Sequence, residues 1–225
     1  MHWKSVPRLW PDSTVFIIGG GPSVNSTDLS LIHSHRVIGV NNAYGDPIHD
    51  ESGKLVGMLP RAWVDICWFG DNGWWNQHHE FMRKFPNLIA SCATNNNIRY
   101  RVHRVKCVDR GKAGGIEKEP WHISWNNCSG TAAINLAYHL GATRVVLIGY
   151  DMRVIDPVWQ GKDLVSGQKN YHSDHSENLH NPFPRYLLKY PTVAKDAKEL
   201  GLEILNATPG SAIKQFPFVR LEDVV

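Results

Sequence analysis

The sequence predicts an α/β fold in which helices cover both faces of a mainly parallel β-sheet, with a small irregular lid or lobe beside it. Short β-branched runs alternate with helix-forming segments along the chain, and this strand–loop–helix order is typical of parallel sheets. Small and polar residues follow the predicted strands, where such sheets bind their ligands. We therefore expect a single domain over 1–225 with a ligand crevice at the carboxyl ends of its strands.

The first half of the chain has segments typical of four strands and two helices. Residues 14–18 (TVFII) predict a buried strand, because the run is short, β-branched and bounded by turn residues. The expected elements are strands at 14–18, 37–40, 62–69 and 87–91, and helices at 24–35 and 74–84. The turn-rich stretch 45–60 predicts an excursion from this order.

The second half contains the clearest helix. Residues 127–150 predict a loop, a helix (TAAINLAYHL), a left-handed cap at Gly141 and a strand (RVVLIG). Strict alternation over 98–105 (IRYRVHRV) predicts a half-exposed strand at an edge or in a lobe. The remaining expectations are a loop at 108–120, a last helix at about 191–200, a final strand LEILN, and excursion or lid segments at about 92–125 and 152–190.

Composition excludes several classes of protein. No run of ~18 apolar residues occurs, so no membrane insertion is expected. The start of the chain lacks the apolar stretch of a signal peptide, which makes a cytoplasmic location the default. The four cysteines show no CxxC spacing, which argues against a zinc ribbon or a disulfide framework. The formal net charge of +3 is too small to indicate a nucleic-acid partner by itself, and a homo-oligomer stays open.

A glycine-rich loop follows the first predicted strand. Glycines let the backbone approach an anion closely, and the N–H groups at the start of the next helix are free to bind it. The loop is not a Walker A motif, because no Gly-Lys-Ser/Thr follows it. It also departs from the dinucleotide fingerprint, because Val24 stands at the third glycine position. The loop supplies four candidate nucleotide-binding residues, Gly20, Gly21, Pro22 and Ser23, and its alternative is a tight turn without a ligand.

A second loop, NCSG, precedes the clearest helix. Ser129 is expected to cap this helix, while the N–H groups of Gly130 and Thr131 could meet phosphate or ribose. Two such loops in one sheet favour a nucleotide as the ligand. The other candidates for nucleotide binding follow predicted strands, where the alternative is a turn or cap role: Asn41, Asn42, Asp71 and Asp151.

The stretch His172-Ser173-Asp174-His175 is the leading candidate for acid–base chemistry. Histidine titrates near neutral pH, and a neighbouring carboxylate can orient its ring. The alternatives are a metal site and a solvated polar loop. No DxD motif occurs, which argues against a common metal-dependent sugar-nucleotide transferase, so no metal ligands are expected. A basic stripe could guide an anionic substrate or form a solvated face: Arg99, Arg101, His103, Arg104 and Lys106.

Four stretches, in this order, resemble bacterial CMP-sialic-acid-dependent sialyltransferases: GGGPS, VIGVNNAY, NNCSGTAAINLAYHLGATRVVLIGYDM and KELGLEILNATPGSAIKQFP. The same Rossmann-like skeleton is shared with a related group that includes the archaeal 6-hydroxymethylpterin diphosphokinase. The chain is most similar to uncharacterised phage-encoded members with a His-x-x-Asp-His loop. The resemblance covers most of the chain in motif order, although the loop here is one residue shorter.

The resemblance implies a nucleotide-dependent transferase. The leading hypothesis is glycosyl transfer from a CMP- or UDP-linked sugar, with His175 as general base and His172 or Asp174 orienting it. Tyr150 and Tyr171 are the candidates for the tyrosines that hold the donor phosphate in this family. The acceptor would be a glycan, a small molecule or a modified DNA base.

Two other hypotheses remain open from the sequence. One is an ATP-dependent, diphosphokinase-like transferase in which Asp71 and Asp151 gather Mg²⁺ against the phosphates. The other is a non-catalytic nucleotide-binding module, or a phage enzyme that modifies DNA bases.

Overall fold

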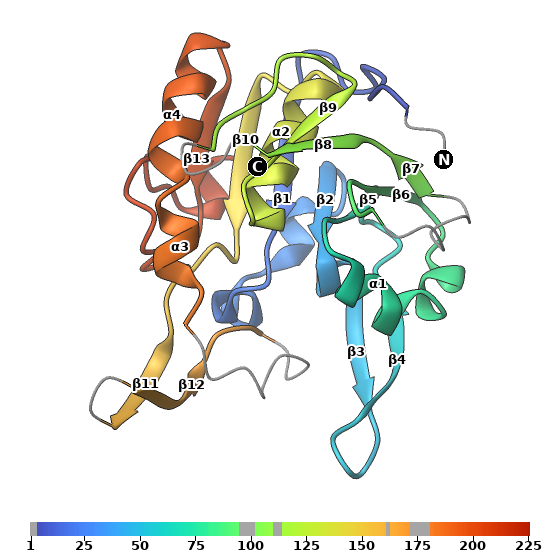
Figure 1. Ribbon diagram of the computed structural model, residues 1–225, viewed down its shortest axis with the longest axis vertical. Helices are drawn as coiled ribbons and strands as arrows, with labels where there is room; N and C mark the ends of the chain where they lie inside the picture. Colours follow the sequence, from blue (N-terminus) through green and yellow to red (C-terminus); the bar gives the residue numbers. More distant parts are fainter. Residues whose placement is uncertain (1–3, 95–101, 110–113, 161–162, 172–180) are drawn as a thin grey trace.

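A seven-stranded, wholly parallel sheet forms the centre of the protein in the computed structural model (Figure 1). The structure describes residues 4–94, 102–109, 114–160, 163–171 and 181–225. The strands lie in the order β13-β10-β1-β2-β5-β6-β7. Their bounds are β1 Thr14–Ile18, β2 Arg36–Val40, β5 Ile66–Phe69, β6 Leu88–Ser91, β7 Val102–Arg104, β10 Arg144–Ile148 and β13 Glu203–Asn206.

The strand order reverses beside β1. From β1 the chain builds outward on one side through β2, β5, β6 and β7, and it then returns to place β10 and β13 on the other side. The carboxyl edge beside β1 and β10 is therefore the switch point of the sheet. Parallel α/β sheets bind their ligands in the crevice outside such a switch point.

Alternate residues of each central strand enter two separate hydrophobic cores. Val15 and Ile17 of β1 pack in the core under α2 (Ser129–Leu140) and α4 (Tyr190–Glu199). Phe16 and Ile18 pack in the core under α1 (Asn72–His78) and the 3-10 helices. The remaining short helices are η1 Pro22–Ser26, η2 Leu29–Ile32, η3 Asn41–Tyr44, η4 Phe81–Lys84, α3 Phe183–Leu187 and η5 Leu221–Asp223. Burial on both faces explains the near-continuous apolar runs of the strands.

Three two-stranded sheets are added to this core. Two are antiparallel hairpins that extend from the carboxyl edge (Figure 1), namely β3 (Gly45–His49) with β4 (Leu55–Pro60) and β11 (Ile155–Gln160) with β12 (Asp163–Gln168). The third is parallel and joins β8 (Lys106–Asp109) to β9 (His122–Trp125). These sheets lie in the stretches where the sequence predicted excursions, although their strands were not predicted. That the chain is a single domain stays a prediction.

The predicted helix at 24–35 is wrong. The segment forms η1 and η2 instead, separated by Thr27 and Asp28 in extended conformations. The Asp28 carboxylate accepts the Ser30 N–H at 3.0 Å, and the Thr27 hydroxyl donates to the Ser23 carbonyl at 2.8 Å. These local bonds replace the helical ones, which is how Ser, Thr and Asp interrupt helices.

Other boundaries differ in smaller ways. The helix predicted at 74–84 ends at His78 and is followed by η4, while the strand at 62–69 begins only at Ile66. The left-handed cap at Gly141 is confirmed, with φ of 104°. Of the alternating stretch predicted at an edge or in a lobe, the described part forms β7, which is the last strand of the sheet on its side. None of the helices in the described ranges is long and apolar enough to cross a membrane.

Candidate functional site

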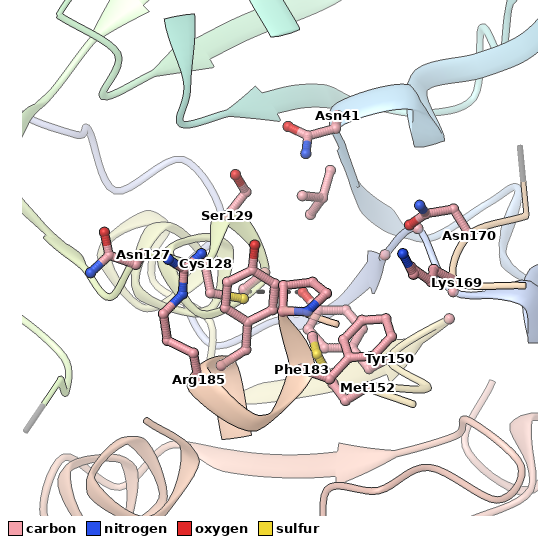
Figure 2. Close-up of a pocket in the computed structure, with 18 of the residues that line it drawn as sticks. Asn41, Asn127, Cys128, Ser129, Tyr150, Met152, Lys169, Asn170, Phe183 and Arg185 are labelled. Carbon is pink, nitrogen blue, oxygen red and sulfur yellow. Dashed lines mark hydrogen bonds between the residues drawn. The ribbon is translucent and has the colours of Figure 1, made fainter. Parts of the chain in front are cut away.

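A cavity of about 460 Å³ opens at the switch point of the sheet (Figure 2). Its walls come from the loops after β1, β2, β5 and β10, the start of α2, the segment after β12 and the start of α3. Among the residues predicted to bind a nucleotide, six line it: Gly20, Gly21, Asn41, Asp71, Ser129 and Gly130. The other predicted residues, Pro22, Ser23, Asn42, Thr131 and Asp151, lie outside its lining.

The glycine loop is bound to the end of β10. The Gly19 N–H donates to the Ile148 carbonyl at 2.7 Å, and the Gly21 N–H donates to the Gly149 carbonyl at 2.8 Å. A Cβ at Gly21 would overlap the Asp151 carboxylate. Glycine is therefore required here for close approach to the protein's own backbone and side chains. This is a different reason from the phosphate contact that the sequence predicted for Gly21.

Ser23 and Asp151 bind each other beneath the loop. The Ser23 hydroxyl donates to Asp151 Oδ2 at 2.7 Å, and the Ser23 N–H donates to Oδ1 at 3.3 Å. Burial raises the pKa of the Asp151 carboxyl, while the bonds from Ser23 act in the opposite direction. Both donors of Ser23 are therefore used inside the protein. In this loop the Gly20 N–H is the donor for which the described part of the chain supplies no partner.

The start of α2 forms the opposite wall. Cys128, not Ser129 as predicted, is the N-cap residue, and Ser129 is the first residue of the helix. Two carbonyls of the first turn accept side-chain hydrogen bonds. Trp68 Nε1–H donates to Ser129 O at 3.1 Å, and the Tyr150 hydroxyl donates to Gly130 O at 3.0 Å. The first N–H groups of a helix lack intrahelical partners and carry its positive dipole end. Ser129 and Gly130 present this end to the cavity.

The two asparagines after β2 have different surroundings. Asn41 lines the cavity in a left-handed conformation, with φ of 53°, and the rest of the described chain offers its buried Oδ1 no hydrogen-bond partner. Asn42 is 1% exposed, and its Oδ1 accepts Trp74 Nε1–H at 2.6 Å. Asn41 thus lines the cavity, whereas Asn42 holds α1 against the sheet.

Asp71 combines a cavity position with a capping role. Its Oδ1 accepts the Trp74 N–H at 2.6 Å and so caps α1. Asp151 lies beneath the glycine loop and does not line the same cavity. The described residues contain no group of three or more His, Cys, Asp or Glu side chains able to hold a metal ion.

The structure adds cavity residues that the sequence did not single out. Lys169 and Asn170 follow β12, and they lie across the cavity from Asn127 and Cys128 in Figure 2. The Tyr171 N–H donates to Gly20 O at 2.9 Å, which ties this segment to the glycine loop. The remaining additions are Trp125 of β9, Met152, and the residues Pro182, Phe183, Arg185 and Tyr186 at the start of α3. For the residues of α3, the run PFPRY, with its prolines before aromatic and basic side chains, was the sequence signal that could have indicated a helix start.

The positive charge of the cavity comes from two sides. Lys169 lies on the glycine-loop side, and Arg185 lies near α2 with its guanidinium carbon 5.2 Å from the Tyr186 ring centre. Burial raises the pKa of the Tyr186 hydroxyl, with Cys128 and Asp71 adding to this effect and the hydrogen bond and charge of Arg185 opposing it. Tyr186 therefore lines the cavity with a protonated hydroxyl.

The two tyrosines that the resemblance offered as phosphate ligands have their hydroxyls engaged. Tyr150 is 1% exposed and bonds to Gly130, while its ring fills the space beside Gly19. The Tyr171 hydroxyl donates to Gly45 O at 3.4 Å. Tyr150 is thus a buried residue that contacts both the start of α2 and the glycine loop.

Several predicted residues fall outside the described part of the chain: His172, Asp174, His175, Arg99 and Arg101. Within the described part, the basic stripe is interrupted. Arg104 is buried, and its guanidinium donates to Ala93 O at 2.7 Å. This side chain holds the turn after β6 and does not belong to a solvated basic face.

Comparison with known proteins supports the fold. No family model matches the chain, and no curated protein matches it in sequence. Two solved structures of the sialyltransferase CstII from Campylobacter jejuni match with TM-scores of 0.50. The first, in complex with cytidine-5'-monophosphate, is 14% identical and the match covers 93% of this chain and 85% of that one. The second, in complex with CMP-3FNeuAc, is 13% identical and the match covers 92% and 86%. The sialyltransferase-like fold predicted from the motifs is therefore confirmed.

Proposed function

We propose that this protein is a transferase that binds a nucleotide-sugar donor, CMP- or UDP-linked, in the cavity at the switch point and transfers its sugar to an acceptor. The observation that carries this proposal is that the α2 N-terminus and Gly20, whose N–H has no partner in the described chain, line one cavity. Helix N-termini and free backbone N–H groups bind phosphate in many nucleotide enzymes. CstII, whose fold is similar, was solved in complex with CMP and with CMP-3FNeuAc, which favours this class of ligand.

The cavity residues suggest a division of roles. The N–H groups of Gly20, Ser129 and Gly130 would bind the phosphate, and Lys169 would neutralise its charge. The Asn41 amide, whose Oδ1 has no partner in the described chain, would bind the ribose or the base. Phe183 offers an apolar face against which a base or sugar ring could stack.

For the acceptor, His175 remains our proposed general base, oriented by His172 or Asp174. On either side of residues 172–180, which lie outside the described chain, Asn170 and Pro182 line the cavity. In the proposed reaction His175 would take the proton of an acceptor hydroxyl as it attacks the sugar. The acceptor itself would be a glycan, a small molecule or a modified DNA base.

No observation favours the ATP-dependent alternative. It requires Asp71 and Asp151 to share a Mg²⁺ ion against the phosphates. In the structure one Asp71 oxygen caps α1, and Asp151 bonds to Ser23 outside the cavity lining. The proposed transfer needs no metal for donor binding.

Nucleotide preference tests the proposal directly. We expect CMP or UDP to raise the melting temperature without Mg²⁺, and we expect Lys169→Ala to reduce that shift. Lys198→Ala, a change at an exposed residue of α4, serves as the matched control and should leave the shift unchanged. Stabilisation by ATP with Mg²⁺, and by neither CMP nor UDP, would overturn the sugar-transfer proposal. Release of free CMP or UDP from the matching nucleotide sugar would extend the test to catalysis.

A further inference from the structure

A largely buried arginine connects the β3–β4 hairpin to the segment that follows β12. Arg61 comes directly after β4, and its side chain is only 11% exposed. Its N–H donates to Tyr44 O at 2.9 Å, and its carbonyl accepts the Val64 N–H at 3.0 Å. Its Nη1 donates to Ala43 O at 3.4 Å, and its Nη2 pairs with the Asp46 carboxylate at 2.5 Å. Backbone and guanidinium are therefore both held in place.

The same guanidinium lies against two aromatic rings. Its central carbon is 5.9 Å from the ring centre of Tyr171 and 6.0 Å from that of Trp63. Trp63 is supported on its own side by the His33 ring, which stacks on it with ring centres 4.3 Å apart. A cation within about 6 Å of an aromatic ring is attracted to its face, and more strongly where water is excluded. Arg61 therefore holds Tyr171, which lies far from it in the sequence.

Tyr171 is in turn bound to the glycine loop and to the start of β3. Its N–H donates to Gly20 O at 2.9 Å, and its hydroxyl donates to Gly45 O at 3.4 Å. The two residues before it, Lys169 and Asn170, line the cavity. Tyr171 is therefore the point at which the segment carrying these two cavity residues is attached to the rest of the site.

We propose that Arg61 is a positioning residue of the nucleotide site, which acts through Tyr171 to keep Lys169 and Asn170 at the cavity. Arg61 is not among the residues that line the cavity, so its effect on a ligand is indirect. The effect on binding rests on the proposed function, because it requires a nucleotide phosphate beside Lys169. The effect on the structure does not, because loss of Arg61 should loosen Tyr171 whatever the ligand is.

A second arginine of the chain provides a matched control. The Arg36 guanidinium carbon lies 6.0 Å from the Trp10 ring centre, and its Nη1 is 3.8 Å from Asp65 Oδ1. None of these three residues lines the cavity. Arg36→Ala thus removes the same two kinds of interaction, a ring contact and an ion pair, without touching the segment before Tyr171.

Amide hydrogen exchange of the full-length protein, without ligand, tests the structural step. In Arg61→Ala the Tyr171 amide should exchange faster than in the wild type by about tenfold, because its bond to Gly20 O opens more often. In Arg36→Ala the exchange of this amide should stay at the wild-type rate. Unchanged exchange of Tyr171 in Arg61→Ala, or an equal increase in both variants, would overturn the proposal.

Calorimetric titration with CMP and with UDP tests the binding step. For the nucleotide that the wild type binds, Arg61→Ala should weaken the affinity by about threefold to tenfold, and Arg36→Ala should leave it unchanged. Arg61→Lys keeps the charge but not the planar, forked guanidinium, so it should recover part of the affinity. A wild-type affinity in Arg61→Ala would overturn the positioning role. If the wild type binds neither nucleotide, the proposed donor is wrong, whereas faster exchange of Tyr171 in Arg61→Ala still supports the attachment.

Substitutions of Tyr171 make the comparison without replacing the arginine. Tyr171→Phe keeps the ring that Arg61 contacts, whereas Tyr171→Leu removes it, so the leucine variant should lose more nucleotide affinity. In the Tyr171→Leu background, Arg61→Ala should cause no further loss, because the contact through which it acts is already absent. Equal losses in the two Tyr171 variants, or a full additional loss in the double variant, would contradict an effect of Arg61 through this ring.

Discussion

Gly21 has no room for a side chain, although its backbone conformation is one that any residue can adopt, with φ of −70°. A Cβ would overlap the Asp151 carboxylate and approach the Gly149 carbonyl at 2.6 Å. Gly20 differs, because a Cβ there would meet only Asn170 Oδ1, at an ordinary 3.4 Å. The neighbouring glycines therefore differ: Gly21 joins the loop to β10, whereas Gly20 lines the cavity and its N–H has no partner in the described part of the chain.

These two residues give a matched pair of variants. Gly21→Ala should lower the free energy of unfolding by about 1–3 kcal/mol, because overpacking displaces neighbouring atoms. Gly20→Ala should change it by no more than about 0.5 kcal/mol. Chemical denaturation of the two variants measures the difference. Equal stabilities would contradict the close approach at Gly21.

Asp151 gives the protein a pH-dependent stability. Its pKa is raised by burial above the ordinary value of 3.8, so the native state binds a proton more tightly than the unfolded state does. The stability contributed by this group is complete below pH 3.8 and is lost as the pH rises through the native pKa. Asp151→Asn, which carries no charge at any pH, should therefore gain melting temperature relative to the wild type as the pH rises from below 3.8 toward neutrality. If the melting temperature of Asp151→Asn instead falls relative to the wild type over this range, the Ser23 hydrogen bonds outweigh burial in setting the pKa of Asp151.

At the scale of elements, α2 is the part of the site that could be predicted best. Its buried positions repeat with helical spacing, and Gly141 ends it with a left-handed residue. Its N-terminus was also predicted to face the ligand, and Ser129 and Gly130 line the cavity. Its true cap, Cys128, was missed because cysteine is not a usual capping residue. The helix predicted at 24–35 failed for the opposite reason, since local side-chain bonds outweighed an apparent apolar face.

Tyr150 braces α2 against the glycine loop, and this contact can be tested. Tyr150→Phe keeps the ring but removes the 3.0 Å bond to Gly130 O, which should lower the free energy of unfolding by about 0.5–1.5 kcal/mol. Tyr138→Phe, a change at a partly exposed residue of α2, is the matched control and should have a smaller effect. Urea denaturation compares the two. If Tyr150→Phe behaves like its control, the hydroxyl does not support the helix start.

At the scale of the whole molecule, the cavity exists because the strand order reverses beside β1. The glycine loop after β1, the loop after β10 and the start of α2 line one cavity at this edge of the sheet. The β11–β12 hairpin and α3 then bring Lys169 and Arg185 to opposite sides of the same space. Residues as far apart in sequence as Gly19 and Tyr186 therefore line the same cavity.

Patterns in the amino-acid sequence were enough to predict the α/β class, the central strands, α2 and the candidate loops around the site. These features depend on patterns that repeat every two to four residues, and those patterns are visible in the chain. They sufficed to bring six predicted residues to one cavity.

Only the tertiary structure decided what each polar group contacts. Ser23 and Asp151 were both predicted as ligand residues, yet they bind each other across 128 positions of sequence. Asn41 and Asn42 are adjacent, yet one faces the cavity and the other bonds to Trp74. The physical reason is that a donor or acceptor pairs with whatever lies within about 3 Å, and strand order and packing determine that neighbour.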